Sequence, residues 1–121
     1  MTDEAPGPPP AGDPAALERL HKWGGEALQR QLVDMFLGRV PAQLALARDA
    51  ADRGDAEGVR QVAHALKSSA GQLGAVSMQR LCEEAERRAA AGEGASLSPL
   101  VAALEAELDR YREWVRGHMT A

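Results

Sequence analysis

The residues best suited to chemistry lie together between residues 59 and 73. His64 is followed by Lys67 at i+3, by Ser68 at i+4 and by Gly71 at i+7, a spacing that places all four on one side of a helix. An imidazole is nucleophilic near neutral pH, and the charge of Lys67 would disfavour its protonation. The same cation could stabilise charge on a transferring phosphoryl group. The spacing therefore predicts a nucleophile beside a cation on an open helix face.

The helix that carries His64 is predicted to be amphipathic. At about 100° per residue, His64 lies roughly 150° from the centre of the apolar arc. Gly71 costs a helix about 1 kcal/mol relative to Ala, so we expect it to serve the close approach of a partner. The apolar arc contains Val59, Val62, Ala63, Leu66, Ala70 and Leu73, and the predicted docking residues are Arg60, Gln61, Ser68, Gly71 and Gln72.

Composition excludes several classes of protein. The chain has 121 residues, which fits one domain, and its net charge of −4 without a Lys/Arg cluster argues against a nucleic-acid partner. The sequence contains no run of about 18 apolar residues, so no membrane span is predicted. The N-terminus lacks the pattern of a secretory signal. The single cysteine, Cys82, cannot form an internal disulfide. We expect a cytoplasmic protein with no nucleic-acid or membrane partner.

The fold class is predicted to be all-α, because Ala and Leu are abundant and β-branched residues are few. Four substantial helices with short loops predict an up-down antiparallel four-helix bundle over residues 13–117, with a short extra N-terminal helix as a lid. We expect Pro41 to kink the long helix rather than divide it. The expected segments are a disordered Pro/Gly-rich tail (1–12), a short helix (about 13–23, ended by Gly24 and Gly25), helices at about 26–52, 56–73 (capped by Asp55) and 76–91, a last helix from Ser98 or Ser96, and a C-terminal tail (118–121).

Other chemistry finds little support in the sequence. His21, His64, His118 and Cys82 lie far apart and lack ligand spacing, so we expect no metal site. Cys82 is expected to be a buried structural thiol, and His21 and His118 to be surface residues. No phosphate-binding glycine loop or catalytic triad is present, so kinase or hydrolase activity of its own is not expected. The acidic residues Glu83, Glu84 and Glu86 are expected to form a solvated, paired helix face with Arg87 and Arg88.

The segment from His64 to Ala75, HALKSSAGQLGA, resembles the signature of histidine phosphotransfer (HPt) domains of two-component signalling. That signature is His-x-Leu-Lys-Gly/Ser-Ser/Ala, with Gly-Ala about ten positions after the histidine. Phe36 and the stretch from Cys82 to Glu86 also resemble the family, and the likeness extends over about residues 13–116. Ser68 departs from it, since Gly is the more frequent residue there.

The resemblance implies a phosphorelay intermediate with no kinase activity of its own. His64 would accept a phosphoryl group from the phospho-aspartate of a receiver domain, or from a histidine kinase, and pass it to another response-regulator receiver. Lys67 would stabilise charge during the transfer. No cofactor is expected on this chain, because the receiver would supply Mg²⁺. The implied partners are receivers and a sensor histidine kinase, and we expect a monomer.

Three alternatives remain open at this point. The chain could be a helical adaptor or regulator that binds receivers or kinases without phosphotransfer, although it retains both His64 and Lys67. It could be a phosphoacceptor domain of a larger hybrid kinase, with the same chemistry. A metal- or haem-binding bundle is the third, and it lacks paired ligands.

Overall fold

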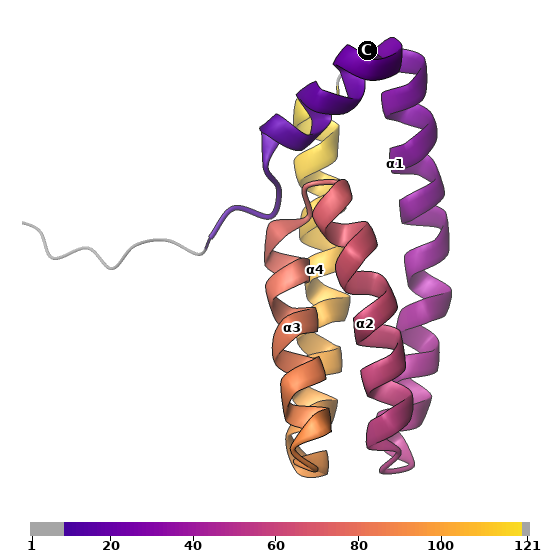
Figure 1. Ribbon diagram of the computed structural model, residues 1–121, viewed down its shortest axis with the longest axis vertical. Helices are drawn as coiled ribbons and strands as arrows, with labels where there is room; N and C mark the ends of the chain where they lie inside the picture. Colours follow the sequence, from indigo (N-terminus) through magenta and orange to yellow (C-terminus); the bar gives the residue numbers. More distant parts are fainter. Residues whose placement is uncertain (1–8, 120–121) are drawn as a thin grey trace, which may run out of the picture.

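The structure, a computed structural model, describes residues 9–119, and within that range all regular structure is helical. Residues 1–8, most of the predicted tail, lie outside the described residues. The elements are α1 (Pro14–Asp52), α2 (Ala56–Gln72), α3 (Val76–Ala90), a 3-10 turn η1 (Gly94–Ser96) and α4 (Leu97–His118) (Figure 1). None of these helices is both long and apolar enough to cross a membrane.

The four helices form an antiparallel up-down bundle, which confirms the predicted fold class. α1 packs against α2 and α4, and α3 packs against the same two helices, so each helix lies between its two neighbours. The first part of α1 lies across the end of the bundle at which α4 ends (Figure 1). The loops are short, and Asp55 caps α2 by accepting a hydrogen bond from the Gly58 N–H at 2.9 Å, as predicted.

Two glycines bend α1 and separate the short predicted helix from the long one. Gly24 and Gly25 leave helical dihedral angles, and Gly25 has φ of 72°, a conformation that glycine adopts without steric cost. The helix begins as predicted, with the Asp13 side chain accepting from the Ala15 N–H and Pro14 in the first turn. We expected Pro41 to kink this helix, but α1 continues through Pro41 with helical dihedral angles, and its departure from helical geometry is at the glycine pair instead.

The core lies between all four helices and includes the predicted apolar arc of α2. Val59, Ala63, Leu66 and Ala70 are buried there, as is the thiol of Cys82 on α3. Burial raises the pKa of the Cys82 thiol to about 12, because an apolar environment disfavours the thiolate. The largest side chains that are fully buried include Tyr111, Leu66, Met78, Leu97 and Leu104.

An aromatic stack leads from the core to the end of α4. Phe36 meets Tyr111 edge to face at 5.6 Å, Tyr111 stacks on Trp114 at 5.7 Å, and Trp114 stacks on His118 at 4.2 Å between ring centroids. The Tyr111 hydroxyl donates to the Leu73 carbonyl at 2.6 Å, which ties α4 to the end of α2. The stack therefore joins α1 to α4, and the Tyr111 hydroxyl links both to the end of α2.

Residues 9–12 of the predicted tail pack against α3 and α4. Ser77 Oγ donates to the Pro10 carbonyl at 2.9 Å, and Arg110 donates to the Pro9 carbonyl at 2.7 Å. Ala11 is buried, and Gly12 lies so close to the Trp114 ring that a Cβ there would be 2.4 Å from it. At the C-terminal end, α4 extends to His118, which was predicted to begin the tail at 118–121, and residues 120–121 lie outside the described residues.

Candidate functional site

His64 lies in the middle of α2, on the face opposite its buried residues. The side chain is 66% exposed, whereas Ala63 and Leu66 beside it are buried. The helix periodicity that buries one arc necessarily turns His64 outward. The imidazole is therefore accessible to a second protein, as its position in the sequence indicated.

A carboxylate from the neighbouring helix binds both His64 and Lys67. Glu86 on α3 places Oε2 at 2.7 Å from His64 Nδ1 and Oε1 at 2.7 Å from Lys67 Nζ. Glu86 is 20% exposed, so the carboxylate is more buried than the ring that it contacts. One residue thus fixes the orientation of the two groups that the sequence selected.

The charges in this network follow from its hydrogen bonds. The hydrogen bond from Lys67 and then that from His64 hold the pKa of Glu86 below its ordinary value. The same Glu86 hydrogen bond raises the pKa of Lys67. Lys67 and Glu86 are therefore both charged at neutral pH, with the ammonium group and the carboxylate in direct contact.

The contact with Glu86 determines which nitrogen of His64 can react. An ionised carboxylate only accepts hydrogen bonds, so Nδ1 carries the proton in the contact with Glu86. In a neutral imidazole the lone pair then lies on Nε2. Within residues 9–119, Nε2 makes no hydrogen bond that would block it, so its lone pair is available to a second protein.

The position of Glu86 differs from the sequence-based expectation. We expected Lys67 to act directly on the imidazole, but the Glu86 carboxylate contacts both groups. We also expected Glu86 to pair with the arginines of its own helix, and this is true of Glu84 instead. Glu84 contacts Arg87 and Arg88 at 2.5 Å each, and these hydrogen bonds lower the pKa of Glu84 to about 2.

A signal for Glu86 was present in the predicted helix pair. α2 and α3 are antiparallel around the turn at Gly74, and residues at similar distances from that turn face each other. His64 precedes Gly74 by ten residues and Glu86 follows it by twelve. The acidic residues at 83–86 lie about as far after the turn as His64 lies before it, so one of them is expected to face His64. The observed side-chain directions show that this residue is Glu86.

The predicted docking residues lie on the outer surface of α2, on both sides of His64. Gln61, Ser68 and Gln72 are exposed, and Arg60 and Gly71 are half-buried. Arg60 is held by Glu57 through two hydrogen bonds of 2.8 and 2.6 Å, and Gln61 donates to the same carboxylate at 3.2 Å. The surface before His64 is therefore ordered by Glu57, a residue without a role in the predicted site.

Gly71 lies against a side chain of the neighbouring helix α3. A Cβ at this position would lie 2.8 Å from the side-chain amide of Gln79 on α3. The Gln79 side chain therefore packs over α2 at Gly71. Like Glu86, it lies where α3 packs against α2. Since Gln79 Nε2 is the end of a flexible side chain that can turn away, this contact does not by itself require glycine at position 71.

A shallow apolar groove extends this surface onto α1. Two adjoining hollows of about 110 and 290 Å³ share Leu32, Gln72 and Leu73 in their walls. Met35 borders one of them, and Trp23, whose side chain is 73% exposed, borders the other. Gln72 thus connects the outer face of α2 to exposed apolar side chains of α1.

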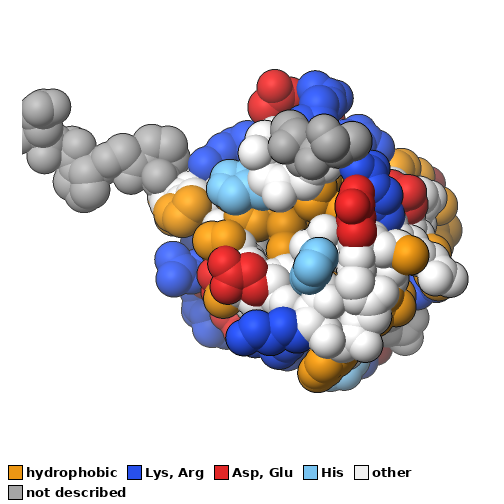
Figure 2. Space-filling model, turned by 90° about the horizontal axis from the view of Figure 1, so that it is seen from above, with side chains coloured by type: hydrophobic (Ala, Val, Ile, Leu, Met, Phe, Trp, Pro, Cys, Tyr) orange, Lys and Arg blue, Asp and Glu red, His pale blue; other side chains and the backbone are white. Residues whose placement is uncertain are grey.

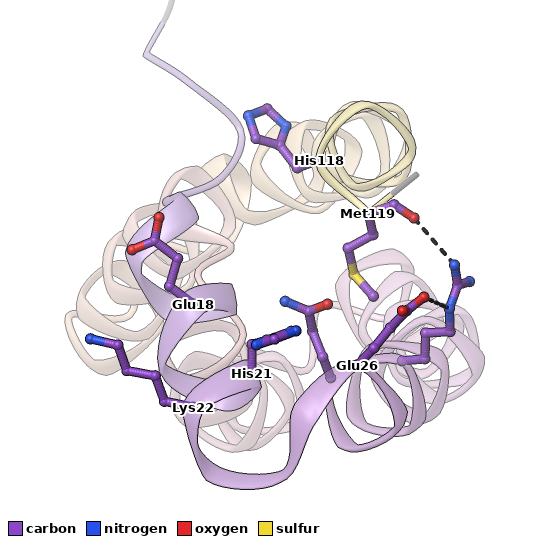
Figure 3. A pocket seen from close by; sticks show the side chains of 8 residues that line it. Glu18, His21, Lys22, Glu26, His118 and Met119 are labelled. Atoms are coloured by element: carbon purple, nitrogen blue, oxygen red, sulfur yellow. Dashed lines mark hydrogen bonds and ion pairs between the residues drawn. The ribbon is translucent and has the colours of Figure 1, made fainter. Parts of the chain in front are cut away.

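A cavity of about 420 Å³ lies elsewhere, at the end of the bundle. It is lined by both parts of α1 and by the end of α4, including His21, Lys22 and His118, and by neither His64 nor Lys67 (Figure 3). Figure 2 looks onto this end, where apolar side chains form the floor of a hollow between histidine and acidic side chains. In residues 9–119 no group of three or more His, Cys, Asp or Glu side chains is placed to hold a metal ion.

Comparison with known proteins identifies the family. A family model described as the Hpt domain matches residues 31–114, which is more than half of the chain, and the chain belongs to this family. The crystal structure of histidine-containing phosphotransfer protein B (HptB) from Pseudomonas aeruginosa PAO1 is similar, with a TM-score of 0.84 and 27% sequence identity over 93% of this chain and 96% of that chain. A search of the curated proteins found no match.

The protein is therefore a phosphorelay intermediate, which confirms the resemblance seen in the sequence. Domains of this family work with receiver domains and histidine kinases, and these are the classes of partner for this chain. The matched region contains α2 and α3 completely, and with them His64, Lys67 and Glu86.

Proposed function

We propose that His64 is the phosphoacceptor and that Nε2 is the atom that is phosphorylated. The observation that carries the proposal is the contact between Nδ1 and Glu86, which leaves the lone pair on the exposed Nε2. A phospho-aspartate of a receiver domain, or a histidine kinase, donates the phosphoryl group, and a second receiver accepts it. The exposure of the ring suits a reaction whose other half lies on another protein.

Lys67 is the charge-stabilising residue of this proposal. Its Nζ is held 2.7 Å from Glu86 beside His64, and its side chain is about one-third exposed. An ammonium group in that position can contact an oxygen of the transferring phosphoryl group without displacement of the helix backbone. The receiver supplies the aspartate and Mg²⁺, and this chain supplies the oriented imidazole and a cation.

The receiver docks on the face made by Arg60, Gln61, Ser68, Gly71 and Gln72. These side chains are small or polar around His64 and continue into the apolar groove beside Gln72. A modest interface of this kind suits a complex that must dissociate after each transfer. The described part of the chain presents this face once, which supports a monomer as the working form, and the free thiol of Cys82 supports a cytoplasmic location.

The experiment is transfer of label from a phosphorylated receiver or an autophosphorylated histidine kinase to the purified protein. The native protein is expected to gain an acid-labile, alkali-stable label, and the His64→Gln variant to gain none. Labelling of His64→Gln at the native rate would contradict the assignment. A native protein that accepts no label from any cognate kinase or receiver would contradict the function itself.

A further inference from the structure

Glu86 is placed to act on the phosphorylated state of His64 as well as on the free imidazole. Its two oxygens are each engaged at 2.7 Å, one by Nδ1 of the ring and one by Lys67. The carboxylate comes from α3, a different helix from the one that carries His64, and is partly buried. It is therefore fixed at the ring nitrogen opposite the one that reacts.

We propose that Glu86 keeps the proton on Nδ1 throughout the phosphoryl cycle and thereby sets the lifetime of phospho-His64. This inference rests on the proposed function, in which Nε2 of His64 accepts the phosphoryl group. Glu86 is a positioning residue in this scheme, because it contacts the imidazole and not the phosphoryl group.

The forward step balances without any movement of a proton. The Nε2 lone pair forms the N–P bond, the P–O bond to the receiver aspartate breaks, and its electron pair leaves with the aspartate carboxylate. The ring keeps its Nδ1 proton and becomes a phosphorylated imidazolium cation. The Glu86 carboxylate at 2.7 Å pairs with that new positive charge.

The retained proton determines how readily the phosphoryl group leaves. When the N–P bond breaks, its electron pair returns to Nε2 and the product is a neutral imidazole. Had Nδ1 lost its proton to solvent, the same step would have to expel an imidazole anion, which is a much poorer leaving group. By holding the proton, Glu86 keeps phospho-His64 ready to donate its phosphoryl group to a receiver. For the same reason, Glu86 also shortens the time that phospho-His64 survives before water hydrolyses it.

The neighbouring charges support a fixed role for Glu86. Lys67 occupies its second oxygen, and Arg60 on α2 and Glu83 on α3 are the other charged groups that interact with this cluster. Arg60 is held by Glu57, so the direct partners of the Glu86 carboxylate are Lys67 and His64. The carboxylate is thereby prevented from turning away from the ring.

The test measures the loss of phosphate from the phosphorylated protein. Native protein and the Glu86→Gln variant are loaded with phosphoramidate, a small phosphoryl donor that requires no docking, and the phosphorylated residue is mapped by mass spectrometry. Gln has the size of Glu and an acceptor oxygen, but no charge to stabilise the cation. Phospho-His64 is expected to lose its phosphate about tenfold more slowly in Glu86→Gln at pH 8, because charge-assisted hydrogen bonds are roughly twice as strong as neutral ones.

Two further variants and a spectroscopic measurement separate this effect from a change in folding. Glu84→Gln, on the same helix but paired with arginines, is expected to keep the native lifetime, and Glu86→Asp to lie nearer to native than Glu86→Gln. Nitrogen-15 NMR of the free proteins is expected to show the proton on Nδ1 in native protein and both tautomers in Glu86→Gln.

The possible outcomes also separate the two proposals. Equal or faster loss of phosphate in Glu86→Gln, with the phosphate mapped to His64, would overturn the role of Glu86 and leave the phosphoacceptor unchanged. Phosphate mapped to another residue in native protein would overturn the phosphoacceptor itself.

Discussion

The His64 site and the end of α4 hold their imidazoles in different ways. Nδ1 of His64 contacts a carboxylate from another helix, and Nδ1 of His118 contacts the Trp114 carbonyl of its own helix at 2.9 Å. The His118 ring also stacks on Trp114 at 4.2 Å, whereas the His64 ring stands at the surface with Lys67 beside it. Both rings can have their Nδ1 proton fixed, but only His64 has a charged partner there.

The two regions contribute different things to the molecule: the aromatic stack contributes stability, and the Glu86 network contributes the orientation of His64. The aromatic stack through Trp114 and Tyr111 continues into the core, so its contacts stabilise the fold. The Glu86 network lies at the rim of α2 and α3, where ion pairs contribute little to stability but can orient a reacting group. What distinguishes the candidate site is therefore not the histidine alone but its exposed Nε2 together with the Glu86 carboxylate that fixes the ring.

The largest effect on stability is expected at the aromatic stack. Trp114→Ala should lower the free energy of unfolding by about 2–3 kcal/mol, because Trp114 packs on Tyr111, on His118 and on Gly12. Urea denaturation measures the change. Labelling of His64 should continue at the native rate under folding conditions. A stable variant that no longer accepts phosphate would show that the two regions are coupled.

The opposite result is expected for Lys67→Ala. Phosphotransfer from a receiver should slow about tenfold, because a cation near the transferring group is lost. The urea midpoint should stay close to native, since the Lys67 side chain is partly exposed. Lys22→Ala, at the large cavity beside His21, is the matched control and should transfer at the native rate. An unfolded Lys67→Ala variant would instead assign Lys67 a structural role.

The smallest effect is a pH-dependent contribution of Glu86 to stability. Its pKa lies below the ordinary 4.5, because Lys67 and His64 donate hydrogen bonds to the carboxylate. A lowered folded-state pKa contributes stability above the unfolded-state value, and that contribution is lost as the pH falls through the folded-state value. The difference in unfolding free energy between native protein and Glu86→Gln should therefore be larger at pH 7 than at pH 3. The loss of unfolding free energy caused by Trp114→Ala should be the same at pH 7 and at pH 3. If the loss caused by Glu86→Gln were also the same at both pH values, it would reflect lost packing rather than lost charge.

Most of the fold could be predicted from local signals. The buried arc of α2, the Asp55 cap and the Gly24–Gly25 break all depend on residues close together in the sequence, and each is observed. The packing of residues 9–12 could not be predicted in this way. It depends on Trp114 and Arg110, about 100 residues away, whose contacts leave no periodic pattern near the Pro-rich segment.

The candidate site shows the same division. His64 and Lys67 share one helix, so their spacing alone places them side by side. Glu86 comes from another helix, and the choice among Glu83, Glu84 and Glu86 depends on the rotation of α3 against α2, which a single sequence does not specify. The groove beside Gln72 depends likewise on how α1 packs against α2.

The burial of Cys82 has a practical consequence. The thiol is fully enclosed, and with a pKa of about 12 it stays protonated at neutral pH, so the folded protein should resist thiol-directed dyes. A cysteine introduced on the exposed face of α2, for example at Gln72, would then be the single reactive position. A fluorophore attached there would report the arrival of a receiver at the surface beside His64.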